Sequence, residues 1–220
     1  MWHSISGWIN DVSKMRGGIL MITLKNVQVS FHEQQILRDV SYVFEDHLFY
    51  LITARNGAGK TTLLNTIANL VPYNGDITFR LKSDDFFYIP HDYQFIPHMT
   101  GMDYYNLYWS LWESKADLTE IITALKINDF INKKISEYSL GMRQLFVLGL
   151  YLVSDTQLWM MDELNNGLDN ENLNVLLEQL RIAKKAQRTI LFVTHQTDDV
   201  SRLADIVVDL TGGTLHERMA

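Results

Sequence analysis

The fold of this chain is decided by the stretch Ala54-Arg55-Asn56-Gly57-Ala58-Gly59-Lys60-Thr61-Thr62. It follows a strand-like apolar run, residues 48–52, and precedes a helix-like run, residues 63–70. A glycine-rich turn between a strand and a helix points successive backbone N–H groups into one concavity, and the helix N-terminus adds partial positive charge. The stretch therefore predicts a loop that cradles a polyphosphate.

Two side chains at the end of this loop have the chemistry that a bound nucleotide requires. Lys60 is expected to reach the β- and γ-phosphates of ATP, and the Thr61 hydroxyl to ligate Mg²⁺. One letter departs from the pattern G-x-x-x-x-G-K-[ST], because Ala54 stands at its first glycine. If the backbone φ there is positive, alanine costs on the order of 1 kcal/mol, whereas a negative φ makes the change nearly harmless.

Composition bounds the class of protein. The 220 residues are 47% hydrophobic, enough to bury one domain core. The formal net charge of −7 argues against general nucleic-acid binding, which needs a basic face. The absence of cysteine excludes disulfides, zinc–thiolate sites and cysteine catalysis. No apolar run approaches the roughly 20 residues of a membrane span.

The first 20 residues form an N-terminal extension that admits two interpretations. Apolar residues recur at helical spacing from Trp2 to Met15, which is typical of an amphipathic helix on a membrane surface, although Gly7 interrupts it. Alternatively, Arg16-Gly17-Gly18 can be encoded by a bacterial ribosome-binding sequence a short spacer before Met21. We favour the second interpretation, in which residues 1–20 are translated leader and Met21 is the start.

From Met21 the pattern alternates between strands and helices, which predicts an α/β fold. The Thr100-x-x-Asp103 capping box opens a helix rich in aromatic residues. Residues after 212 are expected to be a C-terminal tail, 213–220. The predicted strands lie at 22–30, 36–44, 48–53, 77–79, 157–161, 189–194 and 205–210, and the helical segments at 60–70, from 100 through 153, and at 171–185.

A second motif is the apolar run 158–161 followed by Asp162 and Glu163. A buried strand would present both carboxylates at its C-terminal end, beside the phosphate loop. Asp162 would then hold Mg²⁺, and Glu163 would orient or deprotonate the attacking water. The simpler interpretation, a strand ending in a solvated acidic turn, would be the better one without the phosphate loop.

A third motif is the segment Tyr138–Gln144, which opens a helical stretch. Ser139 and Gly141 at a helix start can bind phosphate through a hydroxyl, backbone N–H groups and the helix dipole. In isolation an ordinary N-cap would be the preferred interpretation.

These three segments, in this order, resemble the ATPase subunit of an ABC transporter, over about residues 21–212. The resemblance implies a P-loop NTPase α/β core with an antiparallel β subdomain and a helical subdomain inserted at about 100–153. Tyr138–Met142 is similar to the signature of peptide- and antibiotic-export subunits. Residues 162–169 resemble the family's D-E-P-T-x-x-L-D stretch, with Asp169 in the D-loop position.

The resemblance carries over to further positions, one at a time. His195, after Thr194, matches the switch histidine that contacts the γ-phosphate, and Phe31 matches the aromatic residue that stacks on adenine. His91 stands where the family has the Q-loop glutamine, with Gln94 close by as a substitute. The implied catalytic residues are Lys60, Glu163 and His195; the nucleotide-binding residues are Phe31, Ala54 to Thr62, Ser139 and Gly141; the metal ligands are Thr61, Asp162 and His91.

Two further departures lie near the chemistry. Leu140 replaces one signature glycine, which the export subgroup tolerates. Leu164-Asn165 replaces Pro-Thr after Glu163, which we expect to alter loop stiffness rather than chemistry. Because the catalytic set is intact, the sequence predicts a working ATPase that uses ATP and Mg²⁺. The departures at Ala54 and His91 lead us to expect slow turnover.

The family's mechanism implies the partners. Two ATPase domains, as a homodimer or heterodimer, meet head to tail, so that Lys60 of one faces Ser139 and Gly141 of the other across ATP. The family's mechanism also implies a separate transmembrane permease as a partner. The chain is then expected to lie peripherally at the cytoplasmic face of the cell membrane. The aromatic run 104–112 serves either permease docking or core packing. Three other classes of protein fit less well. Ribosome-acting ABC proteins carry a second ATPase domain, DNA-repair ATPases carry a long coiled coil, and phosphate-loop kinases lack the segment Tyr138–Gln144 and His195. The alternative function is a weakly hydrolysing regulatory subunit in a heterodimer.

Overall fold

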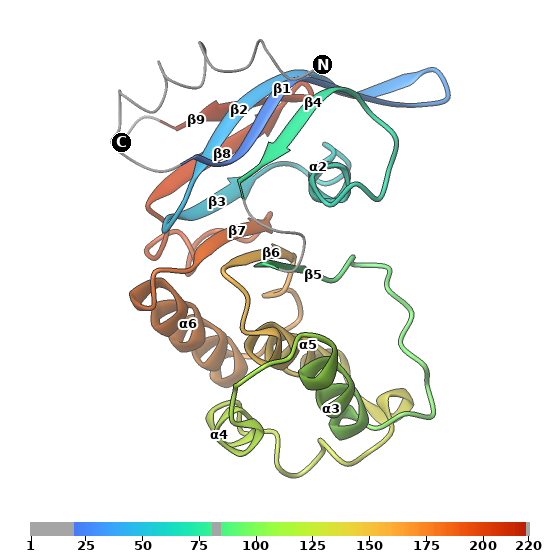
Figure 1. Ribbon diagram of the computed structural model, residues 1–220, viewed down its shortest axis with the longest axis vertical. Helices are drawn as coiled ribbons and strands as arrows, with labels where there is room; N and C mark the ends of the chain where they lie inside the picture. The colour runs from blue at the N-terminus through green and yellow to red at the C-terminus, as the bar shows by residue number, and fades with distance from the viewer. Residues whose placement is uncertain (1–19, 81–84, 219–220) are drawn as a thin grey trace.

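The computed structural model describes residues 20–80 and 85–218, which form two sheets and a group of helices (Figure 1). Both interpretations of residues 1–20 concern a segment outside this range, apart from Leu20, where β1 begins. The elements are β1 (Leu20–Phe31), β2 (Gln34–Glu45), β3 (Phe49–Thr53), α2 (Lys60–Ile67), β4 (Asn74–Phe79), β5 (Phe86–Tyr88), α3 (Gly101–Leu111), α4 (Leu118–Ala124), η2 (Ile135–Glu137), α5 (Leu140–Ser154), β6 (Leu158–Asp162), α6 (Asn170–Lys185), β7 (Thr189–Thr194), β8 (Ile206–Thr211) and β9 (Thr214–Glu217).

The larger sheet has the strand order β5-β6-β7-β3-β8-β9 and is parallel except for the β8–β9 pair. Every residue of β3, β6 and β7 is buried. This explains why those strands read as continuous apolar runs, because a parallel sheet is covered on both faces. The carboxyl ends of these three strands therefore meet at one edge, where the phosphate loop and the Asp162-Glu163 pair begin.

The smaller sheet, β2-β1-β4, is antiparallel and packs with α2 against one face of the larger sheet (Figure 1). One core cluster joins these layers through Leu24 of β1, Ile52 of β3, Leu63 of α2 and Met160 of β6. The α/β core with an antiparallel β subdomain, expected from the sequence, is present.

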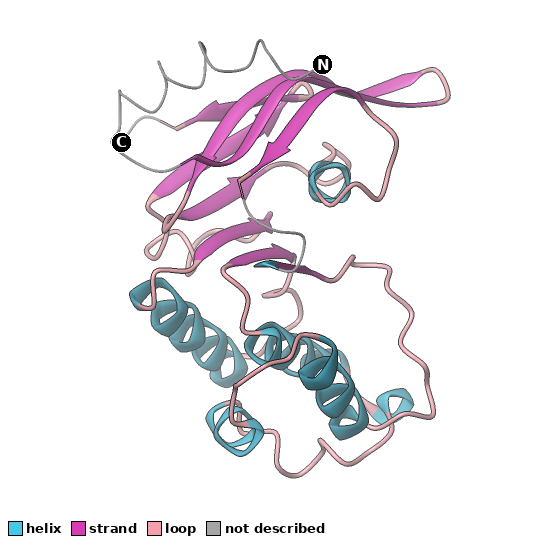
Figure 2. Ribbon diagram, in the orientation of Figure 1, coloured by secondary structure: helices cyan, strands magenta, loops and turns pink. Residues whose placement is uncertain are grey.

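The helices α3, α4 and α5 lie between β5 and β6 in the chain, and with α6 they face the other side of the larger sheet (Figure 2). The capping box of α3 is confirmed: Thr100 Oγ1 accepts from the Asp103 backbone N–H, and Asp103 accepts from that of Thr100. Tyr105 is fully buried and stacks on Phe146 of α5 at 5.6 Å between ring centroids. Aromatic packing between α3 and α5 thus forms much of this second core cluster.

Two parts of the sheet differ from the sequence prediction. The segment 213–220, expected as a tail, contains β9, because Gly212 and Gly213 have φ of 60° and 83° and form a tight turn that returns the chain along β8. The short strand β5 was not predicted, since its three residues are too few to show a period. Within residues 20–80 and 85–218, no helix is long and apolar enough to cross a membrane.

Candidate active site

The phosphate loop runs from Ala54, just after β3, to Lys60, the first residue of α2. Gly57 and Gly59 have φ of 77° and 100°, the left-handed region that glycine tolerates best. A Cβ on Gly59 would lie 2.6 Å from Cγ2 of Ile36. Ala54 is not among the residues with positive φ, so the conformation in which alanine is nearly harmless is the one present.

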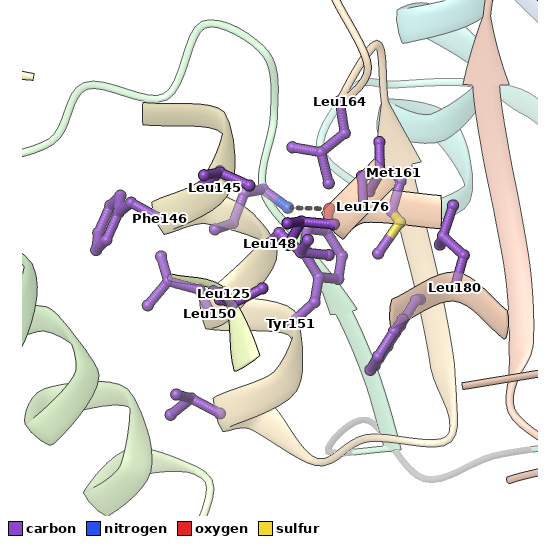
Figure 3. Close-up of a cluster of buried hydrophobic side chains, with 14 of the residues drawn as sticks. Leu125, Leu145, Phe146, Leu148, Leu150, Tyr151, Met161, Leu164, Leu176 and Leu180 are labelled. Atoms are coloured by element: carbon purple, nitrogen blue, oxygen red, sulfur yellow. Dashed lines mark hydrogen bonds between the residues drawn. The ribbon is translucent and has the colours of Figure 1, made fainter. Parts of the chain in front are cut away.

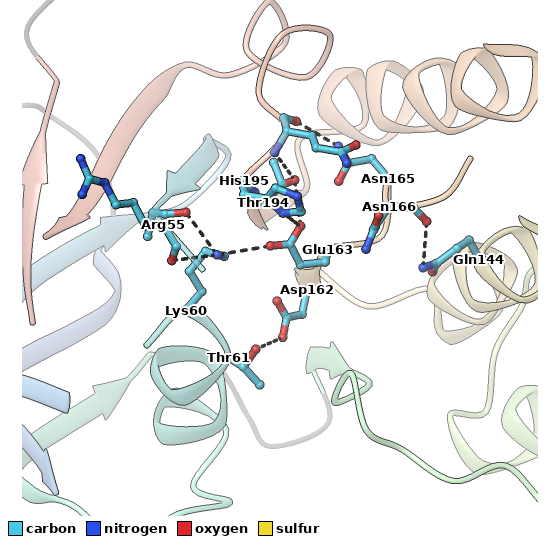
Figure 4. Close-up of polar contacts among 12 residues, drawn as sticks. Arg55, Lys60, Thr61, Gln144, Asp162, Glu163, Asn165, Asn166, Thr194 and His195 are labelled. Atoms are coloured by element: carbon cyan, nitrogen blue, oxygen red, sulfur yellow. Dashed lines mark hydrogen bonds and ion pairs between the residues drawn. The ribbon is translucent and has the colours of Figure 1, made fainter. Parts of the chain in front are cut away.

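Lys60 is buried and lies between its own loop and Glu163 (Figure 4). Its ammonium donates to the carbonyl oxygens of Ala54 at 3.2 Å and Arg55 at 3.3 Å. The same nitrogen lies 3.3 Å from Oε1 of Glu163. This arrangement holds a cation beside the phosphate loop, where it can contact the phosphates of a nucleotide bound there.

Thr61 and Asp162 form the second contact across the site. The Thr61 hydroxyl donates to Oδ2 of Asp162 at 2.6 Å, while Oδ1 of Asp162 is buried and has no hydrogen-bond partner in the described structure. Burial raises the pKa of Asp162 above its usual range, against the opposing hydrogen bond from Thr61. Mg²⁺ prefers oxygen ligands, and the free carboxylate oxygen of Asp162 and the nearby Thr61 hydroxyl are both oxygen ligands.

The protein supplies only part of such a coordination shell. In the described ranges, no group of three or more His, Cys, Asp and Glu side chains is placed to hold a metal ion. Mg²⁺ usually keeps several waters and shares one or two carboxylates with substrate phosphates. Thr61 and Asp162 therefore fit a magnesium–nucleotide complex better than a metal site made of protein ligands alone.

Glu163 is held by the loop that follows β7. Its Oε2 lies 2.8 Å from Nδ1 of His195 and accepts from the Thr194 hydroxyl at 3.1 Å. Burial raises the pKa of Glu163, but the hydrogen bond from His195 and the charge of Lys60 outweigh it and lower that pKa below its usual value. The backbone at Glu163 has φ of 52°, a left-handed conformation that is uncommon for glutamate and is frequent at functional sites.

Lys60, Thr61, Glu163 and His195 line one cavity of about 430 Å³. Asp162 lines a second cavity, of about 170 Å³, and His91 lines both. Phe31, 43% exposed, lies at the first cavity, where its ring face is available for stacking. The Gln94 amide instead donates to the carbonyl of Asp92. The residues that line the first cavity are Phe31, Ile36, Asn56, Gly57, Gly59, Lys60, Thr61, Thr62, His91, Glu163, Asn166 and His195.

Ser139 and Gly141 lie apart from this cavity, at the start of α5. Ser139 is the N-cap of α5, and its hydroxyl accepts from the Met142 backbone N–H at 3.3 Å. The ordinary N-cap geometry is thus present, and neither residue lines the cavity that contains Lys60. Leu140, 56% exposed, packs over Gly167, since a Cβ there would lie 2.3 Å from Cδ2 of Leu140.

Asn165 lies in the turn after Glu163 and makes a contact that was not predicted from the sequence. It is buried, and its Nδ2 donates to the carbonyl of Gln196, the residue after His195, at 3.0 Å. On the other side of the same turn, Gln144 of α5 donates to the carbonyl of Asn166 at 3.3 Å. The turn after Glu163 is therefore hydrogen-bonded both to the His195 loop and to α5. From the sequence we expected only a change in the stiffness of this loop.

Comparison with known proteins identifies the family. The ABC transporter family model matches residues 37–166, which include the phosphate loop, the segment Tyr138–Gln144 and the Asp162-Glu163 pair. The chain belongs to the ABC transporter family. It is 29% identical to ABC transporter ATP-binding protein NatA of Bacillus subtilis (strain 168), over 91% of this chain and 89% of that protein.

Other ABC proteins extend the comparison. The chain is 29% identical to the sn-glycerol-3-phosphate import ATP-binding protein UgpC of Ruegeria sp. (strain TM1040), over 89% of this chain and 60% of that protein. A solved ATP-binding subunit of an ABC transporter superimposes with a TM-score of 0.80 at 22% identity, covering 90% of each chain, which shows the shared fold. The chain is thus an ATP-binding subunit of an ABC transporter, in a family of ATPases.

Proposed function

We propose that this ABC subunit hydrolyses ATP at the cavity described above and uses the energy to drive a separate membrane permease. The observation that carries the proposal is the position of Glu163, held between Lys60 at 3.3 Å and His195 at 2.8 Å. A carboxylate fixed in this way, with a lowered pKa, is ready to accept a proton from an attacking water. In this proposal, Lys60 and His195 bind the γ-phosphate, and Glu163 orients and activates the water.

Other residues of the proposed site have supporting roles. Backbone N–H groups of residues 54–62 bind the phosphates, and Phe31 stacks on the adenine. Thr61, Asp162 and His91 are the residues proposed to hold Mg²⁺. When bound, the ion neutralises charge that develops on the β- and γ-phosphate oxygens.

Two copies of an ATPase domain are proposed to complete the site. Ser139 and Gly141 do not line the cavity of their own chain. At the N-terminus of α5, they have the donor groups to bind a γ-phosphate presented by a second chain. A head-to-tail dimer, formed with a second copy or with a related ATPase chain, brings them opposite Lys60.

The permease is proposed to dock on the helical part of the chain, at the cytoplasmic face of the membrane. Along α3, Tyr104 and Tyr105 are buried in the core, while Leu107, Trp109 and Leu111 are 42–63% exposed. In this proposal α3 serves both purposes, because Tyr104 and Tyr105 pack in the core and the exposed side chains contact the permease. Its apolar outer side is a suitable surface for a cytoplasmic helix of the membrane partner.

We propose outward transport of a peptide or antibiotic-like compound. The support is the likeness of Tyr138–Met142 to the signature of export subunits, an argument by analogy. A second candidate is a weakly hydrolysing regulatory subunit in a heterodimer. His91 favours it, because an imidazole stands at the cavity where the family has glutamine.

Purified chain, assayed for phosphate release alone and with the membrane protein encoded beside it, tests the proposal. We expect hydrolysis that the permease stimulates, and ATP-dependent efflux of the transported compound in vesicles that hold both proteins. Hydrolysis that appears only when a second ATPase chain is added would support the regulatory candidate. Absence of hydrolysis under all three conditions would contradict both.

A further inference from the structure

The hydroxyl of Tyr151 bridges two strands of the larger sheet. Tyr151 belongs to α5, is 1% exposed, and projects from the helix toward β6 (Figure 3). Its hydroxyl donates to the carbonyl oxygen of Met160 in β6 at 2.5 Å and accepts the backbone N–H of Ile89, just after β5, at 3.4 Å. One side chain thus connects α5, β5 and β6.

This bridge lies where β5 and β6 separate. Their last paired residues are Tyr88 and Met160. Pro90 follows Ile89 and has no N–H, so it cannot donate to a continued ladder. We call the point at which the two strands separate the fork. Beyond it, β6 reaches Asp162 two residues after Met160, and the segment after β5 reaches His91 two residues after Ile89.

The space inside the fork is a cavity of about 170 Å³ that His91, Tyr151 and Asp162 all line. The loop that carries His91 is held to α5 at a second point as well. Arg143 donates to the carbonyl of Tyr93 at 2.9 Å, and its guanidinium lies 5.3 Å from the Phe95 ring centroid. Side chains of α5 therefore contact the loop on both sides of His91.

We propose that Tyr151 is a positioning residue, whose hydroxyl sets the separation of His91 from Asp162 and thereby tunes how strongly Mg²⁺ supports nucleotide binding. The inference rests on the proposed magnesium–nucleotide site. Phenylalanine would fill the same space but could neither donate to Met160 nor accept from Ile89. Groups that orient metal ligands from outside the coordination shell typically change metal affinity by about 10- to 100-fold when they are removed.

The test compares Tyr151→Phe with the wild type in the affinity of a non-hydrolysable ATP analogue, measured once with MgCl₂ and once with EDTA. We expect unchanged affinity in EDTA and a loss of about 10-fold in the tightening that MgCl₂ produces. Tyr105→Phe is the matched control, because that buried hydroxyl also donates to a backbone carbonyl, that of Phe146 at 3.2 Å, away from the fork. The control should keep the wild-type ratio of the two affinities.

Thermal melting of both variants separates a folding effect from a metal effect. If Tyr151→Phe does not fold, Arg143→Ala takes its place, and the same loss of magnesium-dependent tightening is expected from the released loop. A wild-type ratio in whichever of these variants folds would overturn the inference. Failure of the wild-type chain to bind the analogue would instead contradict the proposed function, so the two failures are distinguishable.

Discussion

Nδ1 of His195 lies 2.8 Å from Oε2 of Glu163, so the residue after β7 directly contacts the carboxylate of the residue after β6. The two strands are neighbours in the parallel sheet, in register at Asp162 and Val193. The sheet therefore brings together two side chains that are 32 residues apart in the chain.

Replacing this histidine tests its role in catalysis. His195→Ala removes the hydrogen bond to Glu163 and one proposed γ-phosphate contact. We expect kcat for ATP hydrolysis to fall about 100-fold, the usual cost of losing one such donor. Because His195 is partly exposed, the midpoint of thermal unfolding should change little. A kcat near that of the wild type would contradict the assigned role.

Ala54→Gly tests the conclusion that alanine is harmless at the first position of the phosphate loop. Since Ala54 has no positive φ, glycine gains no conformational freedom that the fold uses. We expect ATP affinity within about twofold of the wild type, and stability lower by about 0.5–1 kcal/mol in urea unfolding. Gly59→Ala is the contrast, because a Cβ would meet Ile36 at 2.6 Å and φ is 100°, and it should lose ATP binding. Marked tightening in Ala54→Gly would contradict this reasoning.

Asn165→Ala removes the hydrogen bond from the turn after Glu163 to the carbonyl of Gln196. We expect kcat to fall several-fold, because the His195 loop loses one fixed point, with ATP affinity near that of the wild type. Steady-state kinetics and equilibrium binding give the two numbers. The cost in stability should be about 1 kcal/mol, the net worth of a typical hydrogen bond. Equal losses in affinity and kcat would indicate general disruption of the site instead.

Arg218→Ala tests the hydrogen bonds that connect the residue after β9, through Asp209, to the strand before the phosphate loop. Arg218 bonds to Asp209 of β8 at 2.7 Å, and the Thr53 hydroxyl also donates to Asp209. The hydrogen bond from Arg218 is the main cause that lowers the pKa of Asp209. The contact therefore stabilises the folded state fully above the usual aspartate pKa of about 3.9, and this stabilisation is lost as pH falls through the lowered pKa.

Chemical denaturation across pH measures this effect. We expect Arg218→Ala to be less stable than the wild type by no more than about 1 kcal/mol at pH 7, because the pair is partly exposed. The difference should disappear as pH falls below the lowered pKa of Asp209, where that carboxyl is protonated. Arg181→Ala, which breaks the exposed pair with Glu178 on α6, is the control and should change stability less. A difference that persists at low pH would show that Arg218 acts by packing, not charge.

Much of the fold and site could be predicted because local sequence carried it. The sequence around the phosphate loop predicts a strand, a turn and a helix, and an apolar run that ends in Asp162 predicts β6. The capping box at Thr100 likewise needs only four residues. Each of these signals depends on neighbours in the chain, which a single sequence displays.

The remainder depends on contacts between distant segments. The Asn165–Gln196 and Tyr151–Ile89 hydrogen bonds join residues 31 and 62 positions apart. Asn165 departs from the motif in which it lies, and Tyr151 lies outside every motif, so neither contact could be predicted. The sequence could state both consequences of Ala54 but could not choose between them, since the sign of φ follows from the packed loop. The strand β9 was missed because the domain was predicted to end at residue 212, and the hairpin turn at Gly212-Gly213 was not predicted.

Glu163→Gln tests the central claim, that this chain hydrolyses ATP with Glu163 as the group that activates water. The amide keeps the shape of the side chain but cannot accept the proton, whereas Lys60, Thr61 and Asp162 are untouched. The measurement is phosphate release by the purified chain with its permease, alongside equilibrium binding of ATP. We expect hydrolysis at background level, with ATP bound as tightly as by the wild type. Wild-type hydrolysis by Glu163→Gln would contradict the claim.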